Sequence, residues 1–286
     1  MHGVPHRFWV REVRKKSMSL YDRATDWVEA RMVHEGGCRK FVAVSELTKD
    51  IFLRHYPINP EKVCVIHPGV HLEAFSKKSK DAVRQAVRGN LGLEADVFVL
   101  AFASMNFEIK GLDDILAALS QVRKKGGRFK IVIAGKGNAS KYQKIAARIG
   151  LSDAIVFTGA LEKDKLIDLY LAADAYVMLS KFDTFGMVVL EAMAAGLPVI
   201  VSGNVGAKDL VREGENGFVV ENPADHEKTA AKIALLLDGT VRRKMSEAAL
   251  QTASENTWTQ TAAKYLDIYH ELLDANMAQT PDLKKL

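Results

Sequence analysis

The sequence lacks any hydrophobic run long enough to cross a membrane. No apolar stretch approaches the roughly twenty residues that a transmembrane helix needs. The N-terminus is charged and has no apolar segment of the kind found in a secretory signal peptide. These absences predict a cytoplasmic protein, with peripheral attachment to the inner face of the cytoplasmic membrane as an open alternative.

Cysteine is scarce, and its placement gives no metal site. Cys38 and Cys64 are the two cysteines of the chain, and they lie in separate apolar stretches. Their spacing is not that of a metal-binding module and fits a protein of a reducing compartment. The sequence also shows no stacking motif or recognition helix beside its basic residues. We therefore expect neither a bound metal nor a nucleic-acid partner.

What is present is the composition of an ordinary soluble globular protein. Of the 286 residues, 48% are hydrophobic and 26% are charged, which is usual for such proteins. The length suggests one large domain, or one domain and part of another. The formal charge of +5 is a mild basic bias that suits anionic ligands or an anionic membrane surface without requiring either.

Apolar segments of two kinds alternate along the chain. Short runs typical of buried strands are separated by stretches with apolar residues at i, i+3 and i+4, which predict helices. The expected strands are residues 41–44, 63–66, 97–103, 130–134, 154–157, 175–179 and 198–201. The expected helices include residues 112–122, 141–149, 163–171, 226–238, 242–254 and 258–273. This alternation predicts an α/β fold with a doubly wound parallel sheet, whose ligands bind beyond the carboxyl ends of the strands.

The segment FDTFGMVVLEAMAAG, residues 182–196, places two acids around the start of an apolar helix. Asp183 follows a predicted strand, and Glu191 lies inside the helix. The first N–H groups of a helix have no partner within it and attract anions, and Gly186 lets a ligand approach the backbone. Two carboxylates beside such a site suit a ligand with phosphates and hydroxyls, such as a nucleotide sugar. Two plainer interpretations stay open: Asp183 or Thr184 caps the helix, and Glu191 is a solvated residue.

Several segments together resemble the family 4 retaining glycosyltransferases, which have the GT-B fold. Residues 182–196 resemble the family's pair of acids, with Phe-Gly after the first acid and Glu-Ala-Met-Ala at the second. The other segments are KGLDDILAAL from Lys110, IVIAGKGN from Ile131, VFTGALEKDKLIDLYLAADAYVMLS from Val156 and REGENGFVVENPAD from Arg212. They occur in the family's order, which makes the resemblance specific. It implies two Rossmann-like domains, the first for the acceptor and the second for the donor.

The resemblance gives a role to each acid. Glu191 is expected to hold the ribose hydroxyls of the donor nucleotide, and Asp183 is expected to contact hydroxyls of the transferred sugar. The backbone N–H groups around Phe185, Gly186 and Met187 complete the sugar pocket. Relatives usually carry glutamate at the first position, and the shorter side chain of Asp183 leaves the identity of the donor sugar open.

Lys110 is expected to neutralise the diphosphate, since a fixed cation stabilises the negative charge that the leaving nucleoside diphosphate gains. Together with the two acids it makes up the expected catalytic set, and the resemblance implies no metal or other cofactor. Many relatives carry arginine five residues earlier, where this chain has Met105. The candidates to compensate for that lost charge are Ser104, Asn106 and Lys136.

Glycines mark two further loops. The segment GKGNAS, residues 135–140, resembles a dinucleotide fingerprint without its last glycine, but it does not follow the first strand of its domain. Gly135 and Gly137 are therefore expected to make room for the backbone at the donor cleft. In a later loop, Gly159 and Leu161 are expected where the family holds the base.

The resemblance covers the first GT-B domain only in part. Residues 1–75 resemble its last strand, its last helix and the crossing to the second domain. Residues 76–286 resemble the nucleotide-sugar donor domain, with a final helix packing back toward the first domain. The family's early glycine-rich loop and acceptor-side histidine have no counterpart here. Either the chain is a fragment or truncated form, or another chain supplies the missing acceptor domain.

The expected function is the transfer of a hexose, with retention, from a nucleoside diphosphate sugar such as a UDP-sugar to a saccharide or glycolipid. The segments CRKFVAVSELTKDIF and NFEIKGLD resemble lipopolysaccharide-core glucosyltransferases most. The basic stretch HGVPHRFWVREVRKK suits an anionic membrane or acceptor phosphates, or it forms a solvated helix face with core aromatics. A donor-binding module that is inactive alone fits the same site residues. A dehydrogenase does not, because the fingerprint after a first strand is not found.

Overall fold

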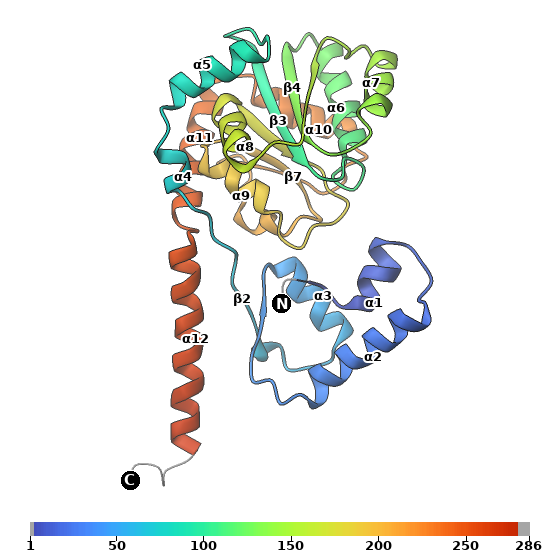
Figure 1. The fold of residues 1–286 in the computed structure, drawn as a ribbon, viewed down its shortest axis with the longest axis vertical. Helices are drawn as coiled ribbons and strands as arrows, with labels where there is room; N and C mark the ends of the chain where they lie inside the picture. Colours follow the sequence, from blue (N-terminus) through green and yellow to red (C-terminus); the bar gives the residue numbers. More distant parts are fainter. Residues whose placement is uncertain (1–2, 280–286) are drawn as a thin grey trace. The chain divides into compact units, whose positions relative to one another are not determined.

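The computed structural model describes residues 3–279, with side chains up to residue 274. The chain divides into two compact units, one of residues 70–255 and one of residues 1–69 with 256–286. The larger unit is built on a six-stranded sheet and the smaller on a two-stranded sheet (Figure 1). Among the described residues, no helix combines the length and the apolar composition that a membrane span requires.

The sheet of the larger unit is parallel throughout. Its strands are β3 (Phe98–Ser104), β4 (Phe129–Gly135), β5 (Ile155–Gly159), β6 (Ala175–Met178), β7 (Val199–Ser202) and β8 (Gly217–Val220). They are arranged as β5-β4-β3-β6-β7-β8, the strand order of a Rossmann fold. The direction of winding reverses between β3 and β6. The carboxyl ends of these two strands therefore flank the crevice where such a sheet binds its ligand.

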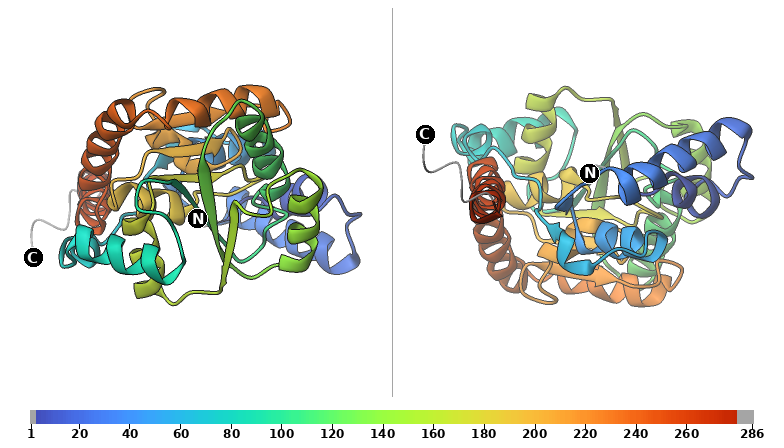
Figure 2. Two further views of the ribbon diagram at one scale, coloured as in Figure 1. Left: turned by 90° about the horizontal axis from the view of Figure 1, so that it is seen from above. Right: turned by 90° about the horizontal axis from the view of Figure 1, so that it is seen from below.

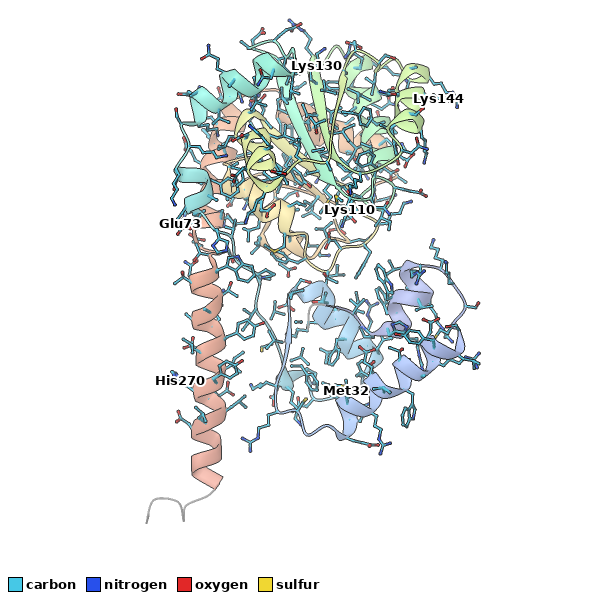
Figure 3. The ribbon with its side chains drawn as sticks, in the orientation of Figure 1. Met32, Glu73, Lys110, Lys130, Lys144 and His270 are labelled. Carbon is cyan, nitrogen blue, oxygen red and sulfur yellow. The ribbon has the colours of Figure 1, made fainter. Side chains whose placement is uncertain are left out.

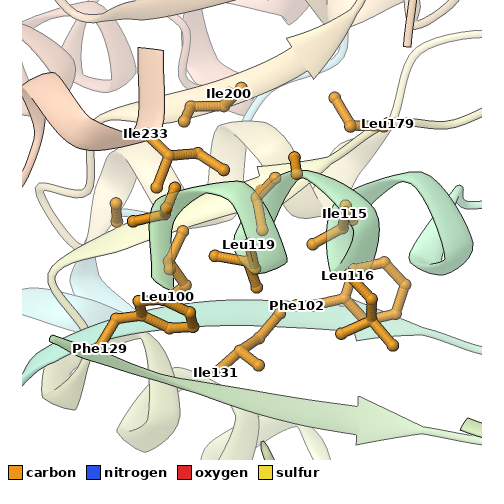
Figure 4. Close-up of a cluster of buried hydrophobic side chains, with 14 of the residues drawn as sticks. Leu100, Phe102, Ile115, Leu116, Leu119, Phe129, Ile131, Leu179, Ile200 and Ile233 are labelled. Atoms are coloured by element: carbon orange, nitrogen blue, oxygen red, sulfur yellow. The ribbon is translucent and has the colours of Figure 1, made fainter. Parts of the chain in front are cut away.

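Helices cover both faces of this sheet (Figure 2). They are α4 (Glu73–Ser76), α5 (Lys80–Asn90), α6 (Leu112–Lys124), α7 (Ala139–Arg148), α8 (Lys163–Ala172), α9 (Met187–Ala194), the 3-10 turn η3 (Gly206–Leu210), α10 (His226–Leu235) and α11 (Gly239–Ser254). Leu100 and Phe102 of β3 share one core with Ile115 and Leu119 of α6 (Figure 4). Successive strand residues point to opposite faces, so apolar strands such as β3 are covered on both sides.

A buried ion pair ties α5 to the sheet. The Arg88 guanidinium donates to Asp174, just ahead of β6, over 2.7 Å, and Arg84 donates to the same carboxylate over 2.8 Å. The backbone N–H of Val99 adds a third bond of 2.8 Å. The other N–H groups of Arg88 donate to backbone carbonyls. Burial lowers the pKa of Arg88, and the neighbouring Asp174 opposes that change.

The smaller unit has a parallel pair of short strands, β1 (Phe41–Ala43) and β2 (Val63–Val65). Its helical elements are α1 (His6–Phe8), the turn η1 (Trp9–Val13), α2 (Leu20–Glu35), α3 (Glu46–His55), the turn η2 (Pro60–Lys62) and α12 (Trp258–Gln279). Its buried cluster is Val33, Ala43, Phe52, Tyr56 and Val63. The Thr261 hydroxyl on α12 donates to the His67 carbonyl over 3.0 Å, which joins the end of the chain to this unit.

The predicted α/β fold with a doubly wound parallel sheet is confirmed. Each expected strand is present, and its ends differ from the predicted ones by at most about two residues, which is the usual uncertainty of element ends. β8 was not predicted. The structure groups residues 256–286 with the smaller unit, whereas the sequence assigned them to the donor domain as its last helix.

Candidate functional site

A pocket of about 300 Å³ lies at the carboxyl ends of β3, β4 and β6. Its lining consists of Ala103, Ser104, Met105, Lys110, Ala134, Gly135, Leu161, Leu166, Asp183, Gly186, Met187 and Val188. These residues come from strand ends and from the first turns of α8 and α9. The pocket thus occupies the point where the strand order reverses, which is where a Rossmann sheet binds its ligand.

Lys110 and Asp183 form an ion pair in this pocket. The Lys110 ammonium donates to Asp183 Oδ2, and both side chains are largely buried. The other oxygen of Asp183 accepts the backbone N–H of Phe185 over 3.2 Å. Asp183 therefore closes a turn ahead of α9, whose N-cap is Gly186. The plainer interpretation of Asp183 as the helix cap does not hold.

The loop from β3 to α6 places the lysine. The Ser104 hydroxyl accepts the backbone N–H of Asn106 over 2.8 Å, and the Asn106 side chain accepts that of Ile109 over 3.0 Å. Gly111 follows in the left-handed region with φ 76°. A Cβ at Gly111 would lie 2.0 Å from the carbonyl oxygen of Leu179, so only glycine allows this approach. Figure 3 shows Lys110 at the end of the six-stranded sheet of the larger unit.

The start of α9 forms another wall of the pocket. Gly186 has φ 90°, and a Cβ there would lie 3.0 Å from side-chain atoms of Met178 and Val205. No side chain of the described residues caps this helix, while Met187 and Val188 line the pocket. The first N–H groups of α9 and its dipole thus favour an anion at this edge.

Glu191 lies one turn beyond the residues of α9 that line the pocket. It is about one turn from Met187 and Val188 on the same side of the helix. Burial raises the pKa of the Glu191 carboxyl, and the positive charge of Lys163 on α8 opposes this. Glu191 itself is not part of the pocket lining. A ligand must therefore reach along α9 to contact it.

The structure brings some of the predicted site residues together and leaves others outside. Those that line the pocket are Ser104, Lys110, Gly135, Leu161, Asp183, Gly186 and Met187. Those outside its lining are Asn106, Lys136, Gly137, Gly159, Phe185 and Glu191. The Phe185 side chain is buried. A Cβ at Gly137 would lie 2.2 Å from the ring of Phe107.

Leu166 and Val188 line the pocket but were not among the predicted site residues. Each lies in the first turn of a helix, α8 or α9, that starts after a loop at the carboxyl edge of the sheet. The signal that marks them is helical spacing, since Val188 and Glu191 are three residues apart and share one side of α9. Met105, whose position lacks the usual arginine, also lies in the lining.

The fold defines a Rossmann-like unit of the GT-B class. Solved structures agree with this class. A glycosyltransferase from Rickettsia africae has a TM-score of 0.76 and 25% identity, covering 86% of this chain and 66% of that one. WaaG, a glycosyltransferase involved in lipopolysaccharide biosynthesis, has a TM-score of 0.76 at 21% identity, covering 93% and 73%. HepE from Anabaena, crystallised with UDP and glucose, has a TM-score of 0.75 at 22% identity, covering 95% and 70%.

The chain belongs to the glycosyl transferases group 1, a family that it matches over residues 83–252. Residues 1–74 match the Glycosyltransferase Family 4. Among curated proteins it is similar to the D-inositol 3-phosphate glycosyltransferase of Streptomyces bingchenggensis, with 32% identity over 90% of this chain and 59% of that protein. The enzyme of the same name from Streptomyces coelicolor is also 32% identical, over 89% of this chain and 61% of its own length. The chain thus spans about three fifths of the length of these relatives.

Proposed function

We propose that this chain is a retaining glycosyltransferase that moves a hexose from a UDP-sugar to a saccharide or glycolipid. The observation that carries the proposal is the Lys110–Asp183 pair in a pocket at the reversal of strand order. A cation, a carboxylate and an uncapped helix start then face one ligand-sized space. This set suits a ligand that combines a diphosphate with sugar hydroxyls.

Each group has one task in the proposed reaction. The bond between the anomeric carbon and the diphosphate breaks, a new bond forms between that carbon and the acceptor oxygen, and the proton of the acceptor hydroxyl passes to the leaving diphosphate. Lys110 and the N–H groups at the start of α9 stabilise the negative charge that collects on the leaving diphosphate. Asp183 exchanges its contact with Lys110 for hydroxyls of the donor sugar, and Glu191 accepts hydrogen bonds from the ribose. No metal is assigned a role.

We expect a Glu191→Ala variant to bind UDP about ten- to a hundred-fold more weakly than the wild type. The variant loses charge-assisted bonds to the ribose hydroxyls, which are worth about 1.5–3 kcal/mol. Titration calorimetry in EDTA-containing buffer measures the affinity. Uridine should lose affinity to a similar extent, because it carries the same ribose. Glu227→Ala, an exposed acid on α10, serves as the control, and unchanged UDP affinity in Glu191→Ala would remove Glu191 from the site.

A Lys110→Met variant should also bind UDP about ten- to a hundred-fold more weakly, but it should bind uridine as the wild type does. Methionine keeps most of the apolar stem and removes the charge that meets the diphosphate. Lys124→Met is the matched control, because Lys124 is exposed at the end of α6 and lies outside the pocket lining. The same titrations measure both ligands. Equal losses for UDP and uridine would show that the lysine supports the fold and does not contact the diphosphate.

The acceptor is proposed from two directions. The sequence motifs favour a lipopolysaccharide-core saccharide, and the curated relatives are named for an inositol phosphate acceptor. Both acceptors are rich in hydroxyls and are charged or lie beside charged groups. Their negative charge would attract the exposed basic residues Arg11, Arg14, Lys15 and Lys16. The same residues support peripheral contact with an anionic membrane surface on the cytoplasmic side.

A second candidate function, a donor-binding module that works with another polypeptide segment, is supported by the outward face of α2. Leu20, Trp27 and Met32 are 85%, 60% and 65% exposed, and Tyr21 and Val28 are exposed beside them. These side chains recur at helical spacing and so share one side of the helix. Arg31 and Glu35 form an exposed ion pair on the same side, and exposed apolar side chains grouped in this way mark an interaction surface.

The inward face of α2 carries three acids beside Val33, which belongs to the buried cluster. Asp26 accepts from Arg7 over 2.5 Å, Asp22 pairs with His6 over 2.9 Å, and Glu29 accepts the backbone N–H of His6 over 2.7 Å. The Ser19 hydroxyl and then His6 lower the pKa of Asp22 to about 2. The helix therefore directs three of its acids to its own unit and several large apolar side chains outward.

The strands of the smaller unit support the same candidate. β1 and β2 are three residues long, and Phe41, Val42, Cys64 and Val65 are only half-buried. Parallel sheets are normally covered on both faces, and two strands alone are marginally stable. We infer that the occupant of the α2 face is the remaining sheet and helices of a first GT-B domain, carried on the same or a separate chain.

A further inference from the structure

The buried hydroxyl of Tyr170, on α8, has no hydrogen-bond partner among the described residues. The side chain is 0% exposed, so bulk solvent does not reach it. A polar group left in this state destabilises the fold, and buried polar groups are nearly always paired. We therefore expect this hydroxyl, beside a ligand pocket, to gain a hydrogen-bond partner when the ligand binds.

The pocket-facing sides of α8 and α9 converge on this hydroxyl. Leu166 lines the pocket, and Tyr170 is one turn further along the same side of α8. Val188 also lines the pocket, and Glu191 is one turn further along the same side of α9. The Tyr170 phenol and the Glu191 carboxylate are thus each carried one helical turn beyond a residue of the pocket lining.

The charges of these groups act on each other. Burial raises the pKa of Tyr170, and the nearby Tyr176 and the carboxylate of Glu191 raise it further. The positive charge of Lys163, two turns before Tyr170 on α8, opposes the rise in the pKa of Glu191. No side chain or backbone N–H of the described chain donates a hydrogen bond to Glu191. A buried donor without a partner and a half-buried acceptor therefore lie within electrostatic reach of each other.

Packing fixes the Tyr170 ring. It meets the ring of Tyr176 edge-on, with centroids 5.8 Å apart and an interplanar angle of 87°. The Tyr176 hydroxyl donates to the carbonyl of Ala103 over 3.4 Å, and Ala103 lines the pocket. The phenol cannot turn toward solvent, whereas the more flexible Glu191 side chain can change rotamer. Any contact between them is therefore made by movement of Glu191.

We propose that Tyr170 is a positioning residue, whose hydroxyl donates a hydrogen bond to the Glu191 carboxylate and holds it toward the ribose of a bound nucleotide. The inference rests on the proposed function. Ribose hydroxyls donate to one carboxylate oxygen while Tyr170 donates to the other, so both buried groups are satisfied in the complex. An O–H···O⁻ bond of this kind is among the stronger hydrogen bonds of proteins.

Tyr170→Phe tests the proposal, because phenylalanine keeps the ring and removes only the hydroxyl. We expect about ten-fold weaker binding of UDP by titration calorimetry, with unchanged binding of 2′,3′-dideoxy-UDP, which has no ribose hydroxyls to share the carboxylate. In a Glu191→Ala background, Tyr170→Phe should have no further effect on UDP. Thermal unfolding without ligand should show a variant at least as stable as the wild type, since it loses an unpaired hydroxyl.

Tyr142→Phe is the matched control. The Tyr142 hydroxyl donates to Asp113 over 2.8 Å, and Tyr142 does not line the pocket, so its loss should leave UDP affinity unchanged. Wild-type UDP affinity in Tyr170→Phe, or equal losses for UDP and its dideoxy form, would overturn the positioning role alone. Failure of the wild type to bind UDP would overturn the proposed function and, with it, this inference.

Discussion

Supplying the smaller unit with the rest of a first GT-B domain should raise the rate of sugar transfer at least about a thousand-fold over that of residues 1–286 alone. The donor pocket lies within residues 70–255, but transfer also needs an acceptor hydroxyl held beside the anomeric carbon. Such positioning supplies a large share of the rate in two-substrate reactions. A second wall also excludes water from the diphosphate.

The measurement is transfer from radiolabelled UDP-glucose to deacylated lipopolysaccharide core or to inositol 3-phosphate. The first-domain segment of a family member is either fused ahead of this chain or added as a separate chain.

A Trp27→Lys, Met32→Lys double variant should block this gain and leave UDP affinity unchanged, because both residues lie on the α2 face. Efficient transfer by residues 1–286 alone would contradict the prediction. Recovery of turnover on phosphatidylglycerol vesicles, without added protein, would assign the α2 face to the membrane.

An Arg88→Met variant should lose about 3–5 kcal/mol of unfolding free energy. Arg88 is 3% exposed, and methionine would leave Asp174 buried beside β6 with its charge incompletely paired. The backbone carbonyls of Ala95 and Val97 would also lose the donor that Arg88 now supplies. Urea unfolding followed by circular dichroism measures the loss.

The control for Arg88 is a surface pair of the same type. Arg128 donates to Glu94 over 2.7 Å, but their side chains are 73% and 57% exposed. Arg128→Met should therefore cost no more than about 1 kcal/mol. If the two variants lost similar amounts, Asp174 would have to be hydrated or protonated in the folded protein, and the buried pair would not stabilise the sheet.

The sequence predicted the central sheet well because its strands are short apolar runs between amphipathic helices. β8 is the exception. It is four residues long, starts at Gly217 and lies at the edge of the sheet, so its apolar signal is too short to separate from a loop. The start of α9 was predicted at the correct residues, because Gly186 directly precedes the helix and marks its beginning.

The site was predictable only as a set of positions along the chain. Lys110 and Asp183 each follow a strand, and both were expected at the same edge of the sheet. Their direct ion pair depends on β3 and β6 being neighbours, although the residues are 73 positions apart. Strand order is a property of the whole sheet, and the local sequence does not specify it.

The sequence by itself determined the α/β class, the ligand edge and the identity of the charged groups there, because these follow from apolar periodicity and from residues next to strand ends. Only the tertiary structure decided which way α2 faces and what surrounds Tyr170. In α2 the acids turn inward because His6 and Arg7 meet them there. Tyr170 has an ordinary place in a helical pattern, and its unpaired hydroxyl arises because α8 and α9 enclose it where no donor or acceptor of the described chain reaches. Burial and partnership depend on what packs from distant parts of the chain, and a residue's neighbours in sequence do not fix them.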